Sequence, residues 1–433
     1  MLKKRLFSIA CAITIATAMC AVTGCGSSQS SGASQQGAGK VDYSALPKID
    51  MSDKKIVLLT QSEEKATTYK EHYGGEVESI LVSDKEIFTR FMTMVMSEER
   101  VDVFWNYLKP ALATQGYLKN LDEYIDFNQP LWADVKDINN LLQDKEGKHY
   151  CAIPGVQRNM CLWYNTEIFE EYGLDTPESY VKAGTWDWNV LRDMAIKLTT
   201  APGSDGKSSL YGMCVDEVDA FLYSCGKHII SFNGDGTATN NIMSEEIARA
   251  VKFATDLNVV DKVLYTNNDG RERFKQGKVA MISGGVWYRT LWPDMMRSGA
   301  AMFVPFPKDP NADQYYVQQQ SDGYMIPSTA QNVAGACAFI ATKRFDFMDT
   351  SKKERTLAEM KEAYGWNEKH QEMFEKYCGS KDKVGVPISY IPFETGEYYG
   401  DLFARPSLGE PWSTIAAEIA PKIDEKIAIA YEK

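Results

Sequence analysis

A strand–helix–strand pattern in the first quarter of the chain constrains the fold more than any other feature. Residues 54–60 (KKIVLLT) and 101–105 (VDVFW) are short, continuous apolar runs of strand length. Residues 84–99, between them, follow a helical period. The apolar face of that helix is Ile87, Phe91, Met94 and Val95. Two buried strands joined through a helix are typical of a βαβ unit, so we predict an α/β fold with a parallel sheet.

Helix starts can be placed at three points further along the chain. Asn165 or Thr166 is expected to cap one helix, and Ser244 another, because both residue types accept hydrogen bonds from free backbone N–H groups. Thr185 is expected to cap a third helix, with Trp188 on its buried face.

The N-terminus has the composition of a secretion signal. Basic residues at positions 3–5 precede an apolar run over 6–21, and Val22-Thr23-Gly24-Cys25 follows. The run is too short to span a bilayer comfortably as a transmembrane anchor. The segment resembles a bacterial lipobox, in which residues 1–24 are removed and Cys25 becomes an acylated first residue, carrying fatty-acyl chains such as palmitate.

A flexible tether is expected after Cys25. Residues 26–40 (GSSQSSGASQQGAGK) contain no side chain that can build a core. A Gly- and Ser-rich segment of this length spans about 20 Å on average. Two acyl chains on the cysteine would anchor the protein stably. We therefore expect residues 25–40 to hold a folded body on the extracytoplasmic side of the cell membrane.

Composition narrows the class of protein further. Removing residues 1–24, which hold three basic and no acidic residues, leaves 409 residues and takes the net charge from −12 to −15. A chain of this length with 44% apolar residues can bury a large core and is expected to divide into two lobes. The acidic balance lacks the basic face that nucleic-acid binding needs.

Cysteines, histidines and known catalytic motifs give no sign of a metal, cofactor or catalytic site. Six cysteines follow Cys25, without the spacing of a disulfide scaffold, and we interpret them as free and buried, with Cys214 and Cys225 as the pair most open to bonding. The four histidines are scattered, so no zinc motif is present. The chain also lacks a G-x-S-x-G nucleophile elbow.

Four segments resemble, in the same order, a known family. They are residues 101–125 (VDVFWNYLKPALATQGYLKNLDEYI), 153–199 (containing NMCLWYNTEIFEEYGLDTP and TWDWNVLRDMAIKLT), 274–287 (FKQGKVAMISGGVW) and 304–332 (containing VPFPKDP and SDGYMIPSTAQN). This pattern is similar to that of family 1 extracellular solute-binding proteins, the lipoprotein receptors of ABC importers that include maltose-binding protein. The resemblance covers residues 54–332, and the last hundred residues match only in general character.

The resemblance implies a two-lobed, periplasmic-binding-protein-like fold of type II. In such a fold, an interlobe cleft closes on its ligand by motion about hinge strands. We expect the crossing strands at residues 152–157 and 302–306. The expected division gives lobe one residues 41–153 and 303–348, and lobe two residues 158–300 and 349–433.

Two tryptophans are the strongest ligand-binding candidates. Trp105 and Trp287 each lie where a predicted strand ends and a polar or glycine-rich turn begins. An indole in that position can stack on the C–H face of a sugar ring. The alternative is that both are core residues, as most tryptophans are. We interpret Trp188 as core, because it fits the buried face of its helix, and leave Trp186 open.

Polar candidates at the expected edges of the cleft are more numerous. Sugar hydroxyls need directional polar partners, and polar side chains follow several of the predicted strands. The candidates are Gln61, Glu63, Asn106, Arg158, Asp322 and Tyr390.

The resemblance implies a receptor that binds a carbohydrate, favouring an oligosaccharide, and delivers it to the transmembrane subunits of a permease. It implies a monomer without catalytic activity. One alternative is a receptor for another small polar solute. The other is a secreted glycoside hydrolase that uses two carboxylates. Against the hydrolase, strands and helices do not recur eightfold as a barrel would require.

Overall fold

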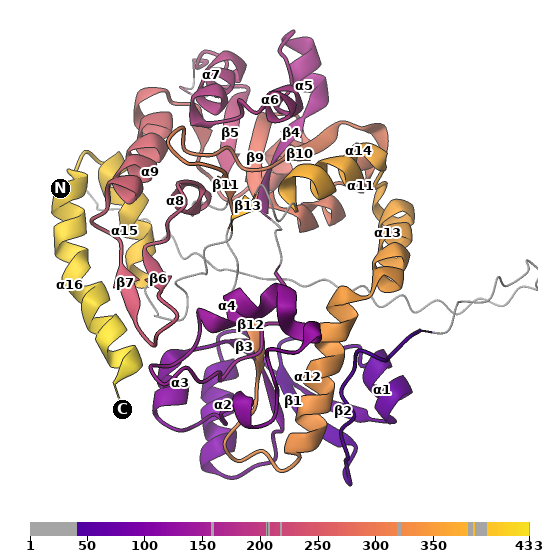
Figure 1. Cartoon of the computed structure of the whole chain (residues 1–433). Coiled ribbons are helices and arrows are strands. Elements are labelled where there is room, and N and C mark those ends of the chain that lie inside the picture. Colours follow the sequence, from indigo (N-terminus) through magenta and orange to yellow (C-terminus); the bar gives the residue numbers. More distant parts are fainter. Residues whose placement is uncertain are drawn as a thin grey trace, which may run out of the picture.

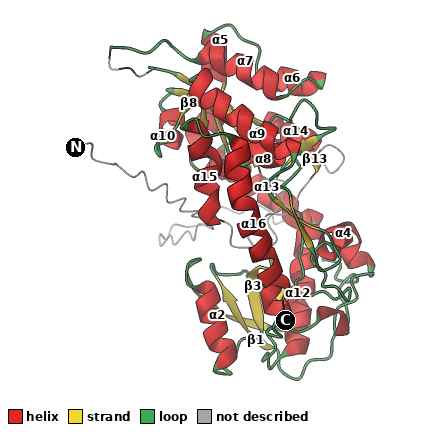
Figure 2. Cartoon of the chain, turned by 90° about the vertical axis from the view of Figure 1, so that its left-hand side faces the viewer, coloured by secondary structure: helices red, strands yellow, loops and turns green. Residues whose placement is uncertain are grey.

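The chain forms two α/β lobes, one above the other in Figure 1. The computed structural model describes residues 41–156, 160–204, 206, 208–216, 219–317, 322–379, 384–385 and 396–432. Each lobe is built around its own sheet, with helices on the sheet faces (Figures 1 and 2). This is the architecture that the βαβ pattern predicted.

Lobe one contains a four-stranded sheet in the order β12-β3-β1-β2. β1 is parallel to both β2 and β3, whereas β12 is antiparallel to β3. The strands are β1 (Lys55–Thr60), β2 (Glu76–Leu81), β3 (Val103–Tyr107) and β12 (Asp322–Met325). The helices are α1 (Thr67–Tyr73), α2 (Ile87–Met96), α3 (Pro110–Thr114), α4 (Lys136–Asn140) and α12 (Val333–Met348), with 3-10 turns η1 (Leu121–Glu123) and η2 (Pro130–Val135).

Helix α2 buries the predicted face. Its four buried residues are Ile87, Phe91, Met94 and Val95. Phe91 stacks on Phe104 of β3 with ring centroids 4.3 Å apart. The prediction of a helix packed on parallel strands is therefore confirmed for β1, β2 and β3, whereas β12 makes the whole sheet mixed.

Lobe two contains a five-stranded sheet in the order β10-β4-β9-β5-β8. β5 is parallel to β8 and β9, and β4 is antiparallel to β9 and β10. The strands are β4 (Met160–Asn165), β5 (Tyr211–Val215), β8 (Leu264–Tyr265), β9 (Val279–Gly285) and β10 (Ala301–Val304), and β6 (Ile230–Phe232) and β7 (Ala238–Asn240) form a separate hairpin. The helices are α5 (Thr166–Glu171), α6 (Pro177–Ala183), α7 (Trp188–Leu198), α8 (Ala220–Ser224), α9 (Glu245–Thr255), α10 (Gly270–Lys275) and α11 (Pro293–Ser298), with π-helical η3 (Asp256–Val260) and 3-10 turn η4 (Val286–Thr290).

Two of the three predicted helix caps are confirmed. The Asn165 side chain caps α5, and the Ser244 hydroxyl caps α9, as predicted. Thr185 does not cap α7. Asp187 does so instead, because its carboxylate accepts from two backbone N–H groups of the first turn, while the Thr185 hydroxyl donates to the carbonyl of Tyr180.

The C-terminal segment connects the lobes. α13 (Thr350–Tyr364) and α14 (Glu368–Met373) pack on lobe two, whereas α16 (Trp412–Tyr431) contacts α3 of lobe one together with α9 and β7 (Figure 1). The apolar core of lobe one continues onto β6, α9 and α16. The remaining elements are β11 (Tyr315–Tyr316), η5 (Phe374–Cys378), β13 (Val384–Gly385) and α15 (Gly396–Ser407).

One expected crossing lies elsewhere. Residues 302–306 were expected to run between the lobes, but Phe303 pairs with Trp163 as part of β10 and is fully buried in the core of lobe two. The apolar run fits a buried edge strand such as β10 as well as a crossing strand, which is why its composition misled. The chain returns to lobe one between Val317, in the second core, and Asp322, the first residue of β12.

The residues before the first crossing are held on lobe one. Ala152 forms a bridge with Tyr324 of β12, and the Ile153 N–H donates to the Asn139 side chain at 2.8 Å. The Arg344 guanidinium donates to the carbonyl of Pro154 at 2.7 Å. Residues 152–154 therefore end the lobe-one part of the chain before β4 begins.

The six cysteines after Cys25 are all buried free thiols. Cys214 and Cys225 are not bonded to each other. Burial raises the pKa of the Cys225 thiol to about 11, which keeps it protonated and unreactive. Among the described residues, no helix combines the length and apolar character needed to cross a bilayer.

Candidate carbohydrate-binding site

The carboxyl ends of the parallel strands in both sheets lie where the chain passes between the lobes. Tyr107, the last residue of β3, pairs with Asp322, and Gly285, the last residue of β9, pairs with Met160. Val156 packs against the lobe-one core, and only four residue steps, at most about 14 Å of chain, separate it from Met160 at the start of β4. The two strand ends therefore lie near each other, as ligand sites of α/β folds require.

We call these two regions the lobe-one edge and the lobe-two edge. The lobe-one edge comprises the residues at the ends of β1, β2 and β3 and the start of β12. The lobe-two edge comprises the residues at the ends of β5, β8 and β9 and the start of β4.

Trp105 lies close to the lobe-one edge. It pairs with Tyr324 across the β3–β12 ladder, and the two ring centroids are 4.3 Å apart. The indole is half-buried and packs against the lobe-one core. Trp105 thus combines a structural contact with a remaining exposed surface.

Three predicted polar residues also lie at this edge. The Gln61 amide donates to the Asp84 carboxylate at 2.8 Å, just after β1, and Glu63 is exposed two residues further on. Asp322 begins β12 and is half-buried. Burial, and secondarily the charge of Asp84, raise the pKa of Asp322 to about 6. The edge therefore carries three carboxylates, those of Glu63, Asp84 and Asp322.

Asn106 differs from its predicted position. It was expected to follow the strand, but it lies inside β3 and is only 2% exposed. Alternation along the strand turns its side chain to the face opposite Trp105. Its Oδ1 accepts from the Tyr107 N–H at 2.8 Å, and its Nδ2 has no partner among the described residues.

The lobe-two edge presents Trp287 on a glycine-dependent turn. β9 ends in Gly284 and Gly285, and η4 follows directly with Trp287 and Tyr288. A Cβ at position 284 would come within 2.2 Å of the Tyr288 ring, and one at position 285 within 2.3 Å of the Trp287 ring. Only glycine lets both aromatic rings fold back over the strand end.

An ion pair holds these two aromatic rings. Asp216, directly after β5, accepts from Arg271 Nε at 2.5 Å and also from the Tyr288 hydroxyl. The Arg271 guanidinium carbon lies 5.0 Å from the Trp287 ring and 4.8 Å from the Tyr288 ring. Both are cation–π distances. Trp287 itself is half-buried.

Two other tryptophans belong to the core. Trp188 is 4% exposed, stacks on Phe253 with ring centroids 4.9 Å apart, and donates to Ser224 Oγ. This confirms its interpretation as a core residue. Trp186 is fully buried and donates to the Pro305 carbonyl at 2.8 Å, so it is a core residue as well.

The sequence analysis missed Asp216, Arg271 and Tyr288. Arg271 follows a strand of only two residues, too short to show an apolar period. Tyr288 could have been found from the sequence, because it directly follows Trp287 after the glycine pair.

Cys25, Arg158 and Tyr390 lie outside the described residues, so their predicted roles stay predictions. Within the described part of the chain, no group of three His, Cys, Asp or Glu side chains is placed to hold a metal.

The fold and the matched sequence define the class. The profile of the bacterial extracellular solute-binding protein family matches residues 59–347. The chain belongs to this family, whose members bind solutes for ABC transporters. Among curated proteins, a sequence search finds no match.

Solved structures share the two-lobed type II fold. An ABC substrate-binding protein of Listeria monocytogenes, in complex with cycloalternan, is 16% identical, with a TM-score of 0.58 over 88% of this chain and 100% of that one. A solute-binding protein of Thermotoga lettingae, bound with α-D-tagatose, is 21% identical, with a TM-score of 0.57 over 86% and 99%. UgpB of Mycobacterium tuberculosis, in complex with glycerophosphocholine, is 12% identical, with a TM-score of 0.56 over 87% and 98%.

Proposed function

We propose that this protein is a lipid-anchored receptor that binds a carbohydrate, favouring an oligosaccharide, between its two interlobe edges and delivers it to the transmembrane subunits of an ABC permease. The observation that carries the proposal is the presence of a half-buried indole at each edge, Trp105 in lobe one and Trp287 in lobe two. Indoles on opposite edges can contact two faces of one ligand or two sugar rings of a chain. The complexes of the Listeria and Thermotoga proteins support a carbohydrate.

The proposed lobes differ from the predicted ones at the second crossing and in the C-terminal segment, where α16 contacts elements of both lobes. Lobe one would hold residues 41–156 and 322–348, and lobe two residues 160–317 and 350–379, because β10 and Val317 pack with the second sheet. Closure would then move the lobes about the three places where the chain passes between them: after Val156, before Asp322 and between α12 and α13. Hinges in such proteins are a few terminal residues of secondary-structure elements.

The proposal of a lipid anchor is based on the sequence alone. Acylation of Cys25 would hold the body on the extracytoplasmic side of the membrane, through the tether over residues 26–40. Replacing Cys25 with Ala and fractionating cells tests this. We expect the variant to lose processing and membrane association. A variant that fractionates and is processed like the parent would remove the anchor from the proposal.

We also propose that the protein releases its ligand unchanged. The hydrolase alternative needs an acid and a second carboxylate flanking one glycosidic bond. Incubating the purified protein with neutral and acidic oligosaccharides, and analysing the products by mass spectrometry, should give no cleavage. Turnover that disappears in Asp322→Asn or in Asp216→Asn would favour a hydrolase instead.

A non-sugar solute is the second candidate, and one observation favours it. UgpB, with the same fold, forms a complex with glycerophosphocholine. Native mass spectrometry of the purified protein, with a set of oligosaccharides and with glycerophosphocholine, separates the two. Binding of the phosphodiester but of no oligosaccharide would overturn the carbohydrate proposal.

A further inference from the structure

Arg271 occupies an unusual place at the lobe-two edge. It lies in the first turn of α10, which follows β8, and β8 runs parallel to β5. The carboxyl ends of β5, β8 and β9 share one edge, so Arg271 lies beside Trp287 where the lobes meet. Its side chain is 42% exposed.

Only one of the three guanidinium nitrogens is used. Nε donates to the Asp216 carboxylate at 2.5 Å and to the Tyr288 hydroxyl at 3.1 Å. Within the described part of the chain, Nη1 and Nη2 have no hydrogen-bond partner. A guanidinium carries five donor hydrogens in a fixed plane. Four of them, on the two terminal nitrogens, are therefore free for a ligand.

The neighbouring rings fix the orientation of this donor pair. The guanidinium carbon lies 5.0 Å from the Trp287 ring and 4.8 Å from the Tyr288 ring, and those two rings meet at 82°. Asp216 holds the guanidinium from the side of Nε. A planar pair of donors beside an apolar plate matches a sugar ring, whose C–H face stacks while its adjacent hydroxyls lie at the rim.

The charges at the two edges favour a neutral ligand. The Arg271 charge is already offset by Asp216. Across from it, the lobe-one edge carries Glu63, Asp84 and Asp322. An acidic sugar would be repelled by these three carboxylates, while the positive charge of Arg271 that could attract it is already paired with Asp216.

We propose that Arg271 determines ligand specificity by donating from Nη1 and Nη2 to two adjacent hydroxyls of a neutral sugar ring that stacks on Trp287. The inference rests on the proposed carbohydrate-binding function and adds to it a residue and a class of ligand.

The same helix supplies a matched control. Arg273 is 37% exposed, pairs with Asp269 at 3.1 Å and lies 5.4 Å from the Tyr265 ring. It thus repeats the chemistry of Arg271, an ion pair beside an aromatic ring, but within the described residues it forms no hydrogen bond, ion pair or cation–π contact with Trp287 or Tyr288.

The experiment is calorimetric titration of the parent and of Arg271→Gln, Arg271→Lys and Arg273→Gln. The probes are neutral tetrasaccharides of glucose, xylose, mannose and galactose, together with tetragalacturonate. For the neutral probe that the parent binds, we expect Arg271→Gln and Arg271→Lys to weaken affinity at least tenfold, because lysine lacks the paired donors. Arg273→Gln should bind within twofold of the parent.

Each of the other outcomes contradicts a defined part of the proposal. If Arg271→Gln binds like Arg273→Gln, or if Arg271→Lys retains full affinity, the donor pair is not the determinant, while the receptor function stands. Preferential binding of tetragalacturonate overturns the neutral ligand. Binding of no probe by the parent overturns the carbohydrate function and the inference with it. Melting of each ligand-free variant checks that it is folded, and Arg271→Lys keeps the charge if Arg271→Gln is unstable.

Discussion

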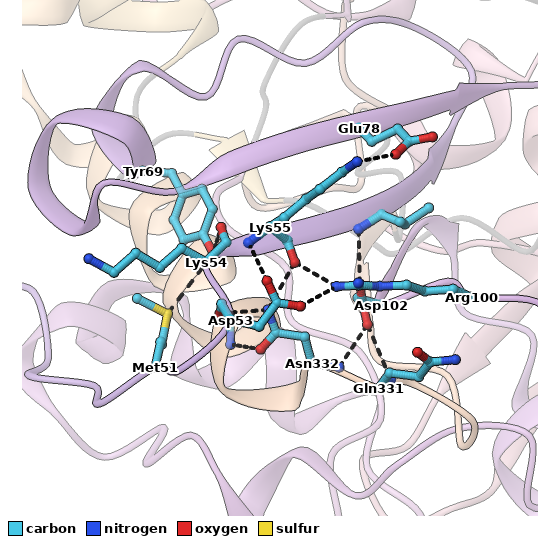
Figure 3. A network of polar contacts seen from close by, with 12 residues as sticks. Met51, Asp53, Lys54, Lys55, Tyr69, Glu78, Arg100, Asp102, Gln331 and Asn332 are labelled. Carbon is cyan, nitrogen blue, oxygen red and sulfur yellow. Dashed lines mark hydrogen bonds and ion pairs between the residues drawn. The ribbon is translucent and has the colours of Figure 1, made fainter.

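The two ends of the four-stranded sheet differ in how many hydrogen-bond donors surround their carboxylates. At the amino end, shown in Figure 3, the fully buried Asp102 carboxylate accepts from four donors. These are the N–H groups of Val57, Gln331 and Asn332, at 3.0, 3.1 and 2.8 Å, and Arg100 Nε at 2.9 Å. Arg100 in turn pairs with Asp53 and donates to the Lys55 carbonyl. This network ties β1, β3 and the start of α12 together.

At the carboxyl end, the lobe-one edge, the carboxylates have few donors. Asp84 accepts from Gln61, while Asp322 is half-buried with a pKa raised to about 6, and Glu63 is exposed. The hydrogen bonds of a fully bonded buried charge offset the cost of its burial, and removing that charge leaves its donors unpaired. A buried charge with few donors makes the folded state less stable. The comparison indicates that the amino end serves stability and that the carboxyl end keeps its acceptors for a ligand.

The largest expected effect is at the amino end. Asp102→Ala removes the acceptor of four hydrogen bonds and leaves buried donors unpaired, so we expect the free energy of unfolding to fall by about 3–5 kcal/mol. Denaturation in urea measures it. Glu78→Gln is the control, because Glu78 pairs with Lys55 nearby but is 55% exposed, and its loss should cost no more than about 0.5 kcal/mol. Equal losses in the two variants would contradict the comparison.

Trp105→Ala tests the carboxyl end. Loss of an aromatic contact commonly costs about 2 kcal/mol of binding, which is roughly thirtyfold in affinity. Because the indole also packs on Tyr324, we expect a smaller loss of stability, about 1 kcal/mol. Calorimetry and thermal melting measure the two effects. Trp188→Ala should show the reverse, lower stability with unchanged affinity, and a Trp105 variant that behaves like it would assign Trp105 to the core alone.

Substitution of Asp322 is expected to have a smaller effect on the free energy of unfolding, and this effect depends on pH. The pKa of Asp322 is about 6 in the folded protein, against about 4 for an unfolded aspartate. Between these values the folded state binds more protons, so its stability falls as pH rises through this window. Asp322→Asn should therefore be more stable than the parent at pH 7.5, by about 1–2 kcal/mol, with the difference vanishing near pH 4.

Denaturation of both proteins at pH 4 and 7.5 measures this difference. Burial also raises the pKa of Asp219 to about 6, so the variant should keep part of the pH dependence of the parent. A difference that is the same at both pH values would contradict the assignment of the pKa to Asp322.

The smallest effect is expected at Glu63. The side chain is exposed, so Glu63→Gln should leave the free energy of unfolding within about 0.5 kcal/mol of the parent. If Glu63 accepts from a ligand hydroxyl, affinity should fall a few-fold, because a glutamine retains one acceptor oxygen. Unchanged affinity would remove Glu63 from the proposed site and leave the edge with Gln61, Asp84 and Asp322.

Local patterns predicted the parts of the fold that depend on local physics. The apolar period of α2 predicted its buried face, and Asn165 and Ser244 cap the helices that they were expected to cap. Trp188 fits the same rule, since helical spacing alone placed it in the core. Each of these depends on residues within one or two turns of chain.

Features that depend on distant residues were not predicted. Residues 301–304 form the edge strand β10 because β4 lies beside them, and the chain between those two strands exceeds 130 residues. Arg271 meets Asp216 across 55 positions and Tyr288 across 17. No local spacing encodes such contacts, so the lobe-two edge became visible only in the folded chain.

The central claim is that one ligand contacts both edges. Calorimetric titration of the purified full-length protein with the neutral tetrasaccharide that it binds best, repeated with Trp105→Ala and Trp287→Ala, tests it most directly. We expect one site in the parent and a loss of about thirtyfold or more in each variant. Trp287→Ala should stay folded and lose only about 1 kcal/mol of stability, because its half-buried ring packs on Tyr288 as that of Trp105 packs on Tyr324. Parental affinity in either variant, or loss of folding in Trp287→Ala, would contradict a site shared between the edges.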